Sequence, residues 1–480
     1  MSHELMAPTM FIVLVALLLL GYPVAFSLAA NGIFFALLGI HLGLLQPELL
    51  QALPERIFGI MRNETLLAIP FFTFMGLILE RSGMAEELLD TIGQLFGALR
   101  GGLAYAVVFV GTLLAATTGV VAASVISMGL ISLPIMMRYG YSHRLASGTI
   151  AASGTLAQIV PPSLVLIVLA DQLGRSVGDM YTAAFVPALI LAGSYIVYVA
   201  IVTVVSPQSA PALPASARIY AGWALARRIV TALVPPLVLI FLVLGTIYLG
   251  IATPTEGGAM GAVGALALAL ARRRLNLPLL RQALQSTAAL TSFVIFILVG
   301  STVFGLTFRA VDGDLWVERL FGDLPGGQLG FLIIVNALVF ALAFFLDFFE
   351  IAFILVPLLA PVAQALGIDL VWFGVILAIN MQTSFMHPPF GFALFYLRSV
   401  APPEVRTSDI YWGAVPFVVI QVIMVCVVIA FPQMIMHYKG DAVKVDPGGI
   451  ELQIPTPDAP PPPQFKSDSA SEEIDRALKR

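Results

Sequence analysis

Residues 344–350 decide the fold, and they read Phe-Phe-Leu-Asp-Phe-Phe-Glu. They lie inside a continuous apolar stretch, 329–366, that is much longer than the roughly 20 residues one membrane-spanning helix needs. Asp347 and Glu350 interrupt this stretch, and carboxylates are tolerated at membrane depth only inside protein or beside a water-filled cavity. We therefore expect a helical hairpin, about 329–366, that enters and leaves on the same side of a membrane and has its tip at the two acids.

A second apolar stretch in the first half of the chain has the same character. Residues 103–137 are too long for one crossing, and they are broken by Thr117, Thr118 and Gly119 and then by Ser124. Hydroxyl groups and a glycine indicate a tip rather than an uninterrupted span. We predict a second hairpin at about 103–137.

The whole composition agrees with a membrane protein. Of 480 residues, 59% are hydrophobic and 11% are charged, against roughly 45–50% and 25% in soluble domains. The apolar stretches between residues 8 and 432 suffice for on the order of ten crossings, and they are long and do not alternate, so helices are expected. The fold class predicted is an all-α polytopic membrane protein.

Several function classes are disfavoured by what the sequence lacks. The net charge is −4 with no basic block, which leaves nucleic-acid binding without an electrostatic footprint. The single cysteine, Cys426, cannot form an internal disulfide or a cysteine-based metal site. The HExxH, GxSxG, Walker A and CxxC patterns are absent, so we expect neither an enzyme nor an ATP site. A transporter of this kind would need an ion gradient or a separate energising subunit.

The two halves of the chain repeat each other at an offset of 227 residues. The coincidences are Pro134 with Pro361, Gly140 with Gly367, and Pro161-Pro162 with Pro388-Pro389. We divide the chain into a first repeat, 1–228, a second repeat, 229–438, and a Pro-rich, charged tail, 439–480, that we expect to be disordered.

Loop charge indicates that the repeats are inverted. If the N-terminus is outside and the first hairpin enters from the cytoplasm, 13 arginines fall in cytoplasmic loops and 5 outside, with the tail left aside. This agrees with the positive-inside rule and places the two hairpins on opposite faces. Inverted repeats with broken helices that meet at the bilayer midplane are the design of secondary transporters.

Candidate ion ligands occur at the first tip and in the helix that Pro161-Pro162 interrupts. Hydroxyl and carbonyl oxygens are hard ligands that suit an alkali cation. An alternative is that small hydroxyl residues only allow close helix packing. The candidates in this half are Thr117, Thr118, Gly119, Ser124, Ser153 and Thr155.

In the second half, Asp347 and Glu350 are three residues apart, which places both carboxylates on nearly one face of a helix. They mark a functional site or, alternatively, a structural pair that caps the hairpin turn. The matching broken helix carries Asn380, Gln382 and Thr383 ahead of His387, which either titrates or serves as a hydrogen-bonding structural group. Glu256 is expected to anchor a helix N-terminus.

At these residues the sequence resembles the large membrane subunit, DctM-like, of tripartite ATP-independent periplasmic (TRAP) transporters. The resemblance extends from about residue 8 to 432 and leaves out the tail. The segments that carry it are 66–72 (LLAIPFF), 159–163 (IVPPS), 252–259 (ATPTEGGA) and 382–396, which begins QTSF and continues through PPFGFALFY from Pro388.

The resemblance implies an elevator-type, Na⁺-driven importer of a small organic carboxylate in the bacterial inner membrane. It implies two partners, a small four-helix membrane subunit and a periplasmic substrate-binding protein. It also implies Na⁺ as the coupling ion, with no organic cofactor, bound at the hairpin tips and the opposed helix breaks. For Na⁺ ligands we single out Thr118, Ser124, Asp347 and Thr383, two from each half. The alternatives are a stand-alone ion-coupled carboxylate transporter and a membrane enzyme or scaffold that uses Asp347 and Glu350.

Overall fold

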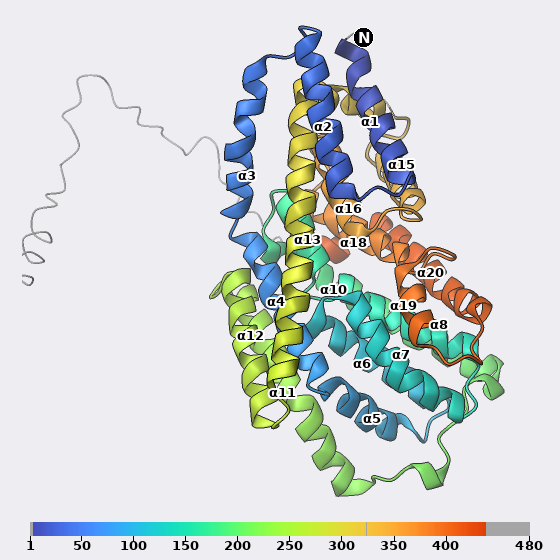
Figure 1. Cartoon of the computed structure of the whole chain (residues 1–480). Coiled ribbons are helices and arrows are strands. Elements are labelled where there is room, and N and C mark those ends of the chain that lie inside the picture. Colours follow the sequence, from blue (N-terminus) through green and yellow to red (C-terminus); the bar gives the residue numbers. More distant parts are fainter. Residues whose placement is uncertain (1–2, 323, 438–480) are drawn as a thin grey trace, which may run out of the picture. The chain divides into compact units, whose positions relative to one another are not determined.

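Helices account for all of the regular structure in residues 3–322 and 324–437, which are the residues that this computed structural model describes (Figure 1). The predicted tail, 439–480, lies outside them. The helices of the first half are α1 (His3–Leu19), α2 (Val24–His41), α3 (Leu53–Met61), α4 (Ala68–Arg81), α5 (Met84–Phe96), α6 (Gly102–Thr118), α7 (Val121–Arg138), α8 (His143–Thr155), α9 (Leu164–Gln172) and α10 (Val177–Val205).

The helices of the second half are α11 (Gly222–Tyr248), α12 (Pro254–Ala271), α13 (Leu277–Ala310), α14 (Gly313–Gly322), α15 (Gly327–Leu342), α16 (Phe348–Ile354), α17 (Val356–Ala365), α18 (Leu370–Ser384), α19 (Phe392–Val400), α20 (Thr407–Ala430) and α21 (Gln433–Met436). Short 3₁₀ turns connect several of them, among them η3 (Leu156–Gln158), which continues α8.

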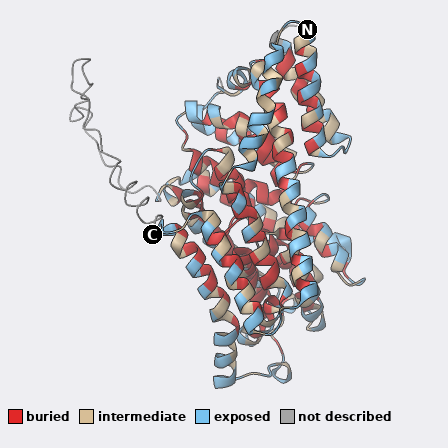
Figure 2. Ribbon diagram, turned by 60° about the vertical axis from the view of Figure 1, so that its left-hand side comes forward, coloured by how far each residue is buried: buried red, intermediate tan, exposed pale blue. Residues whose placement is uncertain are grey.

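Six of the described helices are long and apolar enough to cross a membrane, and the number rises to nine if each bent helix pair forms one span. One bent pair is α16 and α17, which meet at 53° in the second predicted hairpin. Many large apolar residues are exposed, which suits contact with lipid. Figure 2 shows the buried residues running through the interior of the helical assembly and the exposed residues along its outside. The predicted all-helical, multi-pass fold class is confirmed.

The described helices pack as one compact unit, which we divide into two groups to describe it. In the first, which we call the frame group (α1–α5 and α11–α14), the long helix α13 lies along α2 and α4, and α12 packs on α4 (Figure 1). In the second, the hairpin group (α6–α10 and α15–α21), both arms of the first hairpin pack on α8, and α20 crosses α8. Helix α18 contacts α10, α15 and α20. The hairpin group thus gathers the predicted tips and both broken helices.

The two hairpins start from opposite ends of α13. This helix has 34 residues and is about 50 Å long at 1.5 Å per residue, which exceeds the thickness of a bilayer core. At its first end, Arg81 just before α5 donates hydrogen bonds to Gln282 and Ser286, at 3.2 and 3.0 Å. At its last end, Arg309 lies 3.6 Å from Asp314 of α14. Because α6 follows α5 and α15 follows α14, the hairpins begin on opposite faces, as inverted repeats require.

The matched landmarks of the two repeats have matched geometry. Gly140 and Gly367 both have left-handed backbone, with φ of 80° and 74°, and each directly follows the second arm of its hairpin. Pro134 lies inside α7, and Pro361 lies inside α17. The peptide bonds of Pro161-Pro162 and Pro388-Pro389 are both cis, and each pair follows a helix break.

Candidate functional site

The first tip is a turn between α6 and α7. Gly119 has φ +57°, a left-handed conformation that costs glycine nothing, and its N–H donates to the carbonyl of Ala115. Helix α7 then begins after Val120, whose side chain cannot cap the first N–H groups. The side chain of Thr118 lies outside the described residues. The first turn of α7 therefore presents uncapped N–H groups and the positive end of a helix dipole.

The second tip is closed by its two acids. The Asp347 carboxylate accepts from the Glu350 N–H at 2.9 Å, and the Glu350 carboxylate accepts from the Asp347 N–H at 3.0 Å. This reciprocal capping box starts α16 at Phe348. The two acids therefore do cap the hairpin turn, which is the structural alternative offered for them above. A capping role leaves Asp347 free to have a second role.

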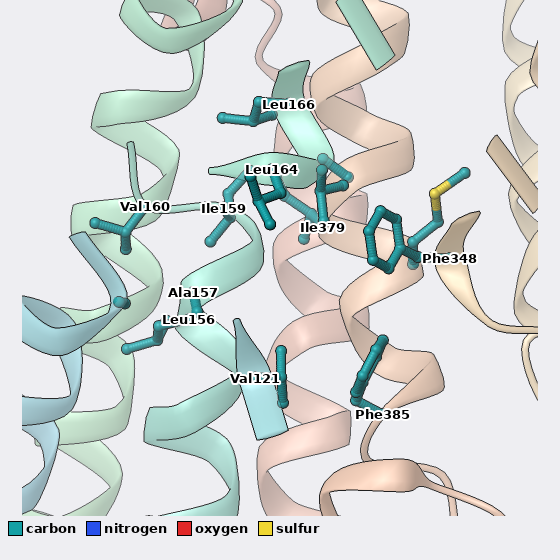
Figure 3. Packing of buried hydrophobic residues seen from close by; sticks show 14 of the residues in the cluster. Val121, Leu156, Ala157, Ile159, Val160, Leu164, Leu166, Phe348, Ile379 and Phe385 are labelled. Atoms are coloured by element: carbon teal, nitrogen blue, oxygen red, sulfur yellow. The ribbon is translucent and has the colours of Figure 1, made fainter. Parts of the chain in front are cut away.

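Both tips line one cavity of about 260 Å³. Asp347 borders it from the second tip, and Gly119 borders it from the first. Figure 3 shows the rings of Phe348 and Phe385 on the side of the second half, with Val121 and Leu164 of the first half across from them. The remaining lining residues are Val120, Ala122, Gln158, Val165, Leu290, Phe293, Phe349 and Tyr396. A space between two hairpin tips and two helix breaks is where a bound solute would contact both repeats.

Gln158 is the most unusual polar group at this cavity. It ends η3, just before the first Pro-Pro pair, and its side chain is 1% exposed. Neither its amide nitrogen nor its carbonyl oxygen has a hydrogen-bond partner in the described part of the chain. A buried amide without partners costs about 1–3 kcal/mol, so the site favours a ligand or water that supplies them.

A second polar cluster lies where the two broken helices meet. Gln382 donates to the hydroxyl of Thr155 at 3.1 Å, and the two residues are 227 positions apart, which is the repeat offset. Gln421 contacts the same hydroxyl at 3.5 Å and donates to the Tyr195 hydroxyl at 2.9 Å. Equivalent positions of the two repeats therefore touch each other, as they do at a pseudo-two-fold axis.

The other predicted site residues are buried around these features. Thr117 donates to Leu114, Thr383 donates to Asn380, and Ser124 is 1% exposed. Asn380 donates to the backbone and the side chain of Asn336, at 2.8 and 2.9 Å. The Ser153 hydroxyl is fully buried and has no partner among the described residues. Of the predicted set, Gly119 and Asp347 line the cavity itself.

Two further sequence interpretations are settled by the packing. Glu256 forms a capping box with Thr253 at the start of α12, as predicted for a helix anchor. His387 is 1% exposed and lies against the rings of Phe340 and Phe344, at centroid distances of 4.2 and 4.3 Å. Neither of its ring nitrogens has a hydrogen-bond partner in the described chain, so the hydrogen-bonding structural role expected for it is not what the packing shows.

Sequence reasoning did not single out Gln158, Phe348 or Phe349 as lining residues. Gln158 carried a usable signal, because it is an amide inside an apolar run, three positions before Pro161. The phenylalanines carried none, since aromatic residues in a membrane helix are as common toward lipid as toward a cavity.

The arrangement defines a class of protein. A multi-pass helical assembly whose two hairpin tips and two broken helices line one cavity has the architecture of secondary transporters. The described residues hold no cluster of three or more His, Cys, Asp or Glu side chains that would bind a metal ion. These features define an integral membrane transport protein.

Comparison with known proteins assigns the family. Residues 11–434 match the family described as "Tripartite ATP-independent periplasmic transporter, DctM component". The chain is 32% identical over 394 residues to the C4-dicarboxylate TRAP transporter large permease protein DctM of Pseudomonas aeruginosa. The alignment covers 81% of this chain and 89% of the relative. The chain therefore belongs to the DctM family of TRAP transporter large permeases. It is a multi-pass protein of the bacterial inner membrane, and its family consists of transport components rather than enzymes.

Other relatives differ in the substrate they are named for. The chain is 28% identical to the ectoine/5-hydroxyectoine large permease UehC of Ruegeria pomeroyi, over 90% of this chain and 99% of the relative. It is 27% identical to the sialic acid large permease SiaM of Vibrio cholerae, over 87% of this chain and 94% of the relative. In fold it is similar to the Alcanivorax borkumensis YdaH transporter, with a TM-score of 0.59 and 15% identity, over 81% of this chain and 90% of that chain. Family membership alone does not define the substrate.

Proposed function

We propose that this chain is the large permease of a Na⁺-coupled importer for a small organic carboxylate. In this proposal it works with a small membrane subunit and a periplasmic substrate-binding protein, and the hairpin group moves across the membrane against the frame group. The observation that carries the proposal is the cavity of about 260 Å³ that both hairpin tips share.

The cavity has features that suit a carboxylate. The uncapped first turn of α7 borders it at Val121 and Ala122 and offers N–H donors together with the positive end of the helix dipole. The Gln158 amide adds a donor that no described group satisfies. Lys and Arg side chains are absent from its described lining, so a bound anion would depend on helix ends and on a coupling cation for charge balance.

The proposed Na⁺ sites lie beside each tip. In the first half, α6 packs on η3, and a Cβ added to Gly119 would lie 3.5 Å from the Pro162 carbonyl oxygen, so the tip lies beside the first helix break. In the second half, α16 packs on α18, which brings Asp347 next to the helix that carries Asn380 and Thr383. Hydroxyls, backbone carbonyls and one carboxylate form the hard oxygen environment that an alkali cation requires.

Thermal unfolding tests the proposed ion coupling. We would measure the detergent-purified chain with its small membrane subunit in NaCl and in choline chloride at equal ionic strength. Na⁺ at ten times its dissociation constant should stabilise the folded state by about 1.4 kcal/mol. Asp347→Asn removes the charge while asparagine still caps a helix, and Ser124→Ala removes a hydroxyl, so each should reduce the Na⁺-specific rise.

The matched control is Ser194→Ala, whose hydroxyl donates to Ile190 on the outer surface of α10 and should leave the rise unchanged. Uptake of labelled carboxylates into proteoliposomes that contain all three components would then test transport. Uptake without a Na⁺ gradient, or uptake by this chain alone, would contradict the proposal and would favour a stand-alone or differently coupled transporter.

A further inference from the structure

The shared cavity is strongly aromatic. Five of its lining side chains carry rings, and four of these form a connected series: Phe293 lies 5.9 Å from Phe349, Phe349 lies 3.8 Å from Phe348, and Phe348 lies 6.4 Å from Phe385, all between ring centroids. Tyr396 is the fifth ring. This series begins on α13 of the frame group, passes over the second tip and ends at the second broken helix.

Polar side chains on the lining of this cavity are few. The polar side chains on the described lining are those of Gln158, Asp347 and Tyr396. Gln158 and the uncapped turn of α7 come from the first repeat, whereas Phe348, Phe349 and Phe385 come from the second. The cavity therefore has one end, from the first repeat, that offers an amide and a helix start as donors, and one end, from the second repeat, that is mainly aromatic and carries Asp347 and Tyr396.

These two ends restrict the solute. One carboxylate group can take the donors of the first repeat, and the rest of the molecule then lies against the rings. A second carboxylate at that end would lie beside the carboxylate of Asp347, with the Tyr396 hydroxyl as the one side-chain donor among the described lining residues there. Burying a second charge next to a like charge is costly, so dicarboxylates are disfavoured. A solute with many hydroxyl groups would leave most of them without partners.

We infer that this permease takes a monocarboxylate with an apolar, ring-bearing or branched body, rather than a dicarboxylate or a sugar acid. The inference rests on the proposed function and adds the class of substrate. Gln158 and the first turn of α7 would bind the carboxylate, and Phe348 and its neighbouring rings would bind the body. The inference sets this chain apart from the relatives named for C4-dicarboxylates and for sialic acid, despite the shared fold.

Calorimetric titration of the purified chain with its small subunit, in NaCl, tests the inference with three probes. Phenylacetate has one carboxylate and a ring, succinate has two carboxylates, and acetate has a carboxylate alone. Phenylacetate should bind about a hundredfold more tightly than succinate, because succinate must bury a second carboxylate beside that of Asp347. Acetate should also bind more weakly than phenylacetate, because it makes no contact with the rings.

Two variants separate the ends of the cavity. Phe348→Leu keeps an apolar side chain but removes a ring, so it should weaken phenylacetate binding about tenfold and hardly change acetate binding. Gln158→Leu should weaken both about tenfold. The control is Phe345→Ala, because Phe345 is 61% exposed and is not among the residues that line this cavity. It should leave all three affinities unchanged.

Succinate binding that equals or exceeds phenylacetate binding would overturn the inference. So would phenylacetate binding that neither variant alters, or no phenylacetate binding by a chain that Na⁺ still stabilises. The proposed function is judged separately, because Na⁺-driven uptake of any carboxylate by the three-component system would support it even if the substrate class were wrong.

Discussion

At the scale of single residues, Thr155 is the group on which the two repeats depend most directly. Its hydroxyl accepts from Gln382 and lies 3.5 Å from the Gln421 amide, and all three side chains are fully buried. Thr155→Val keeps the shape and removes the acceptor, which leaves buried amide hydrogens unpaired. We expect a loss of about 1–3 kcal/mol in unfolding free energy, measured by thermal unfolding in detergent. Thr155→Ser keeps the hydroxyl and should lose less than half as much unfolding free energy as Thr155→Val. Equal losses in the two variants would show that the packing of the Thr155 methyl group, and not its hydrogen bonds, stabilises this region.

Residue roles were predicted unevenly from the sequence, for a physical reason. Asp347 and Glu350 were recognisable because a charge inside an apolar stretch is expensive and requires an explanation. Gln158 was overlooked as a cavity residue because an amide is far less conspicuous, and its importance follows from the missing partners that only packing reveals. The sequence indicates both the offset of the repeats and their inversion, but the contact between Thr155 and Gln382 is visible only in the packed helices.

At the scale of helices, the contact of α8 with α20 depends on two glycines. A Cβ added to Gly148 would lie 2.1 Å from the carbonyl oxygen of Gly413, and one added to Gly413 would lie 2.2 Å from that of Arg144. Backbone cannot yield as a flexible side chain can, so Gly148→Ala must push the two helices apart. We expect a loss of about 1–3 kcal/mol, read as a lower unfolding temperature.

The matched control for this contact is Gly193→Ala in α10, where an added Cβ meets nothing within 4 Å. It should leave the unfolding temperature unchanged or raise it slightly, because alanine favours a helix more than glycine does. A similar drop in both variants would contradict a specific close approach of α8 and α20.

Helix boundaries were the most predictable feature of the fold. The first tip was expected at residues 117–119, and α6 ends at Thr118 because Gly119 takes a left-handed turn. The second was expected at the acids, and α16 begins directly after Asp347 because the capping box starts it there. The bend between α16 and α17 was not foreseen, since Leu355 and Pro357 lie in an apolar run whose hydrophobicity does not reveal a 53° change of direction.

At the scale of the whole molecule, a few polar contacts join the two groups of helices. One is the hydrogen bond from Ser127 of α7 to the Glu80 carboxylate of α4, at 2.6 Å. If the hairpin group moves against the frame group during transport, this contact must break in each cycle. A covalent bond in its place should hold the permease in one state, whereas a bond inside one group should not.

Cysteine cross-linking tests this motion in a chain whose single cysteine, Cys426, is first changed to serine. In Glu80→Cys/Ser127→Cys, oxidation should reduce uptake by proteoliposomes to background, and a reducing agent should restore the activity that the reduced variant had. The control pair is Arg144→Cys/Asp409→Cys, at a 3.2 Å contact between α8 and α20 within the hairpin group. It should cross-link without loss of uptake. Uptake is compared between the oxidised and the reduced form of the same variant, so a defect caused by the substitutions themselves affects both forms equally. Full uptake by the oxidised Glu80→Cys/Ser127→Cys variant would mean that α4 and α7 do not separate during transport. The carboxylate would then cross the membrane by another movement.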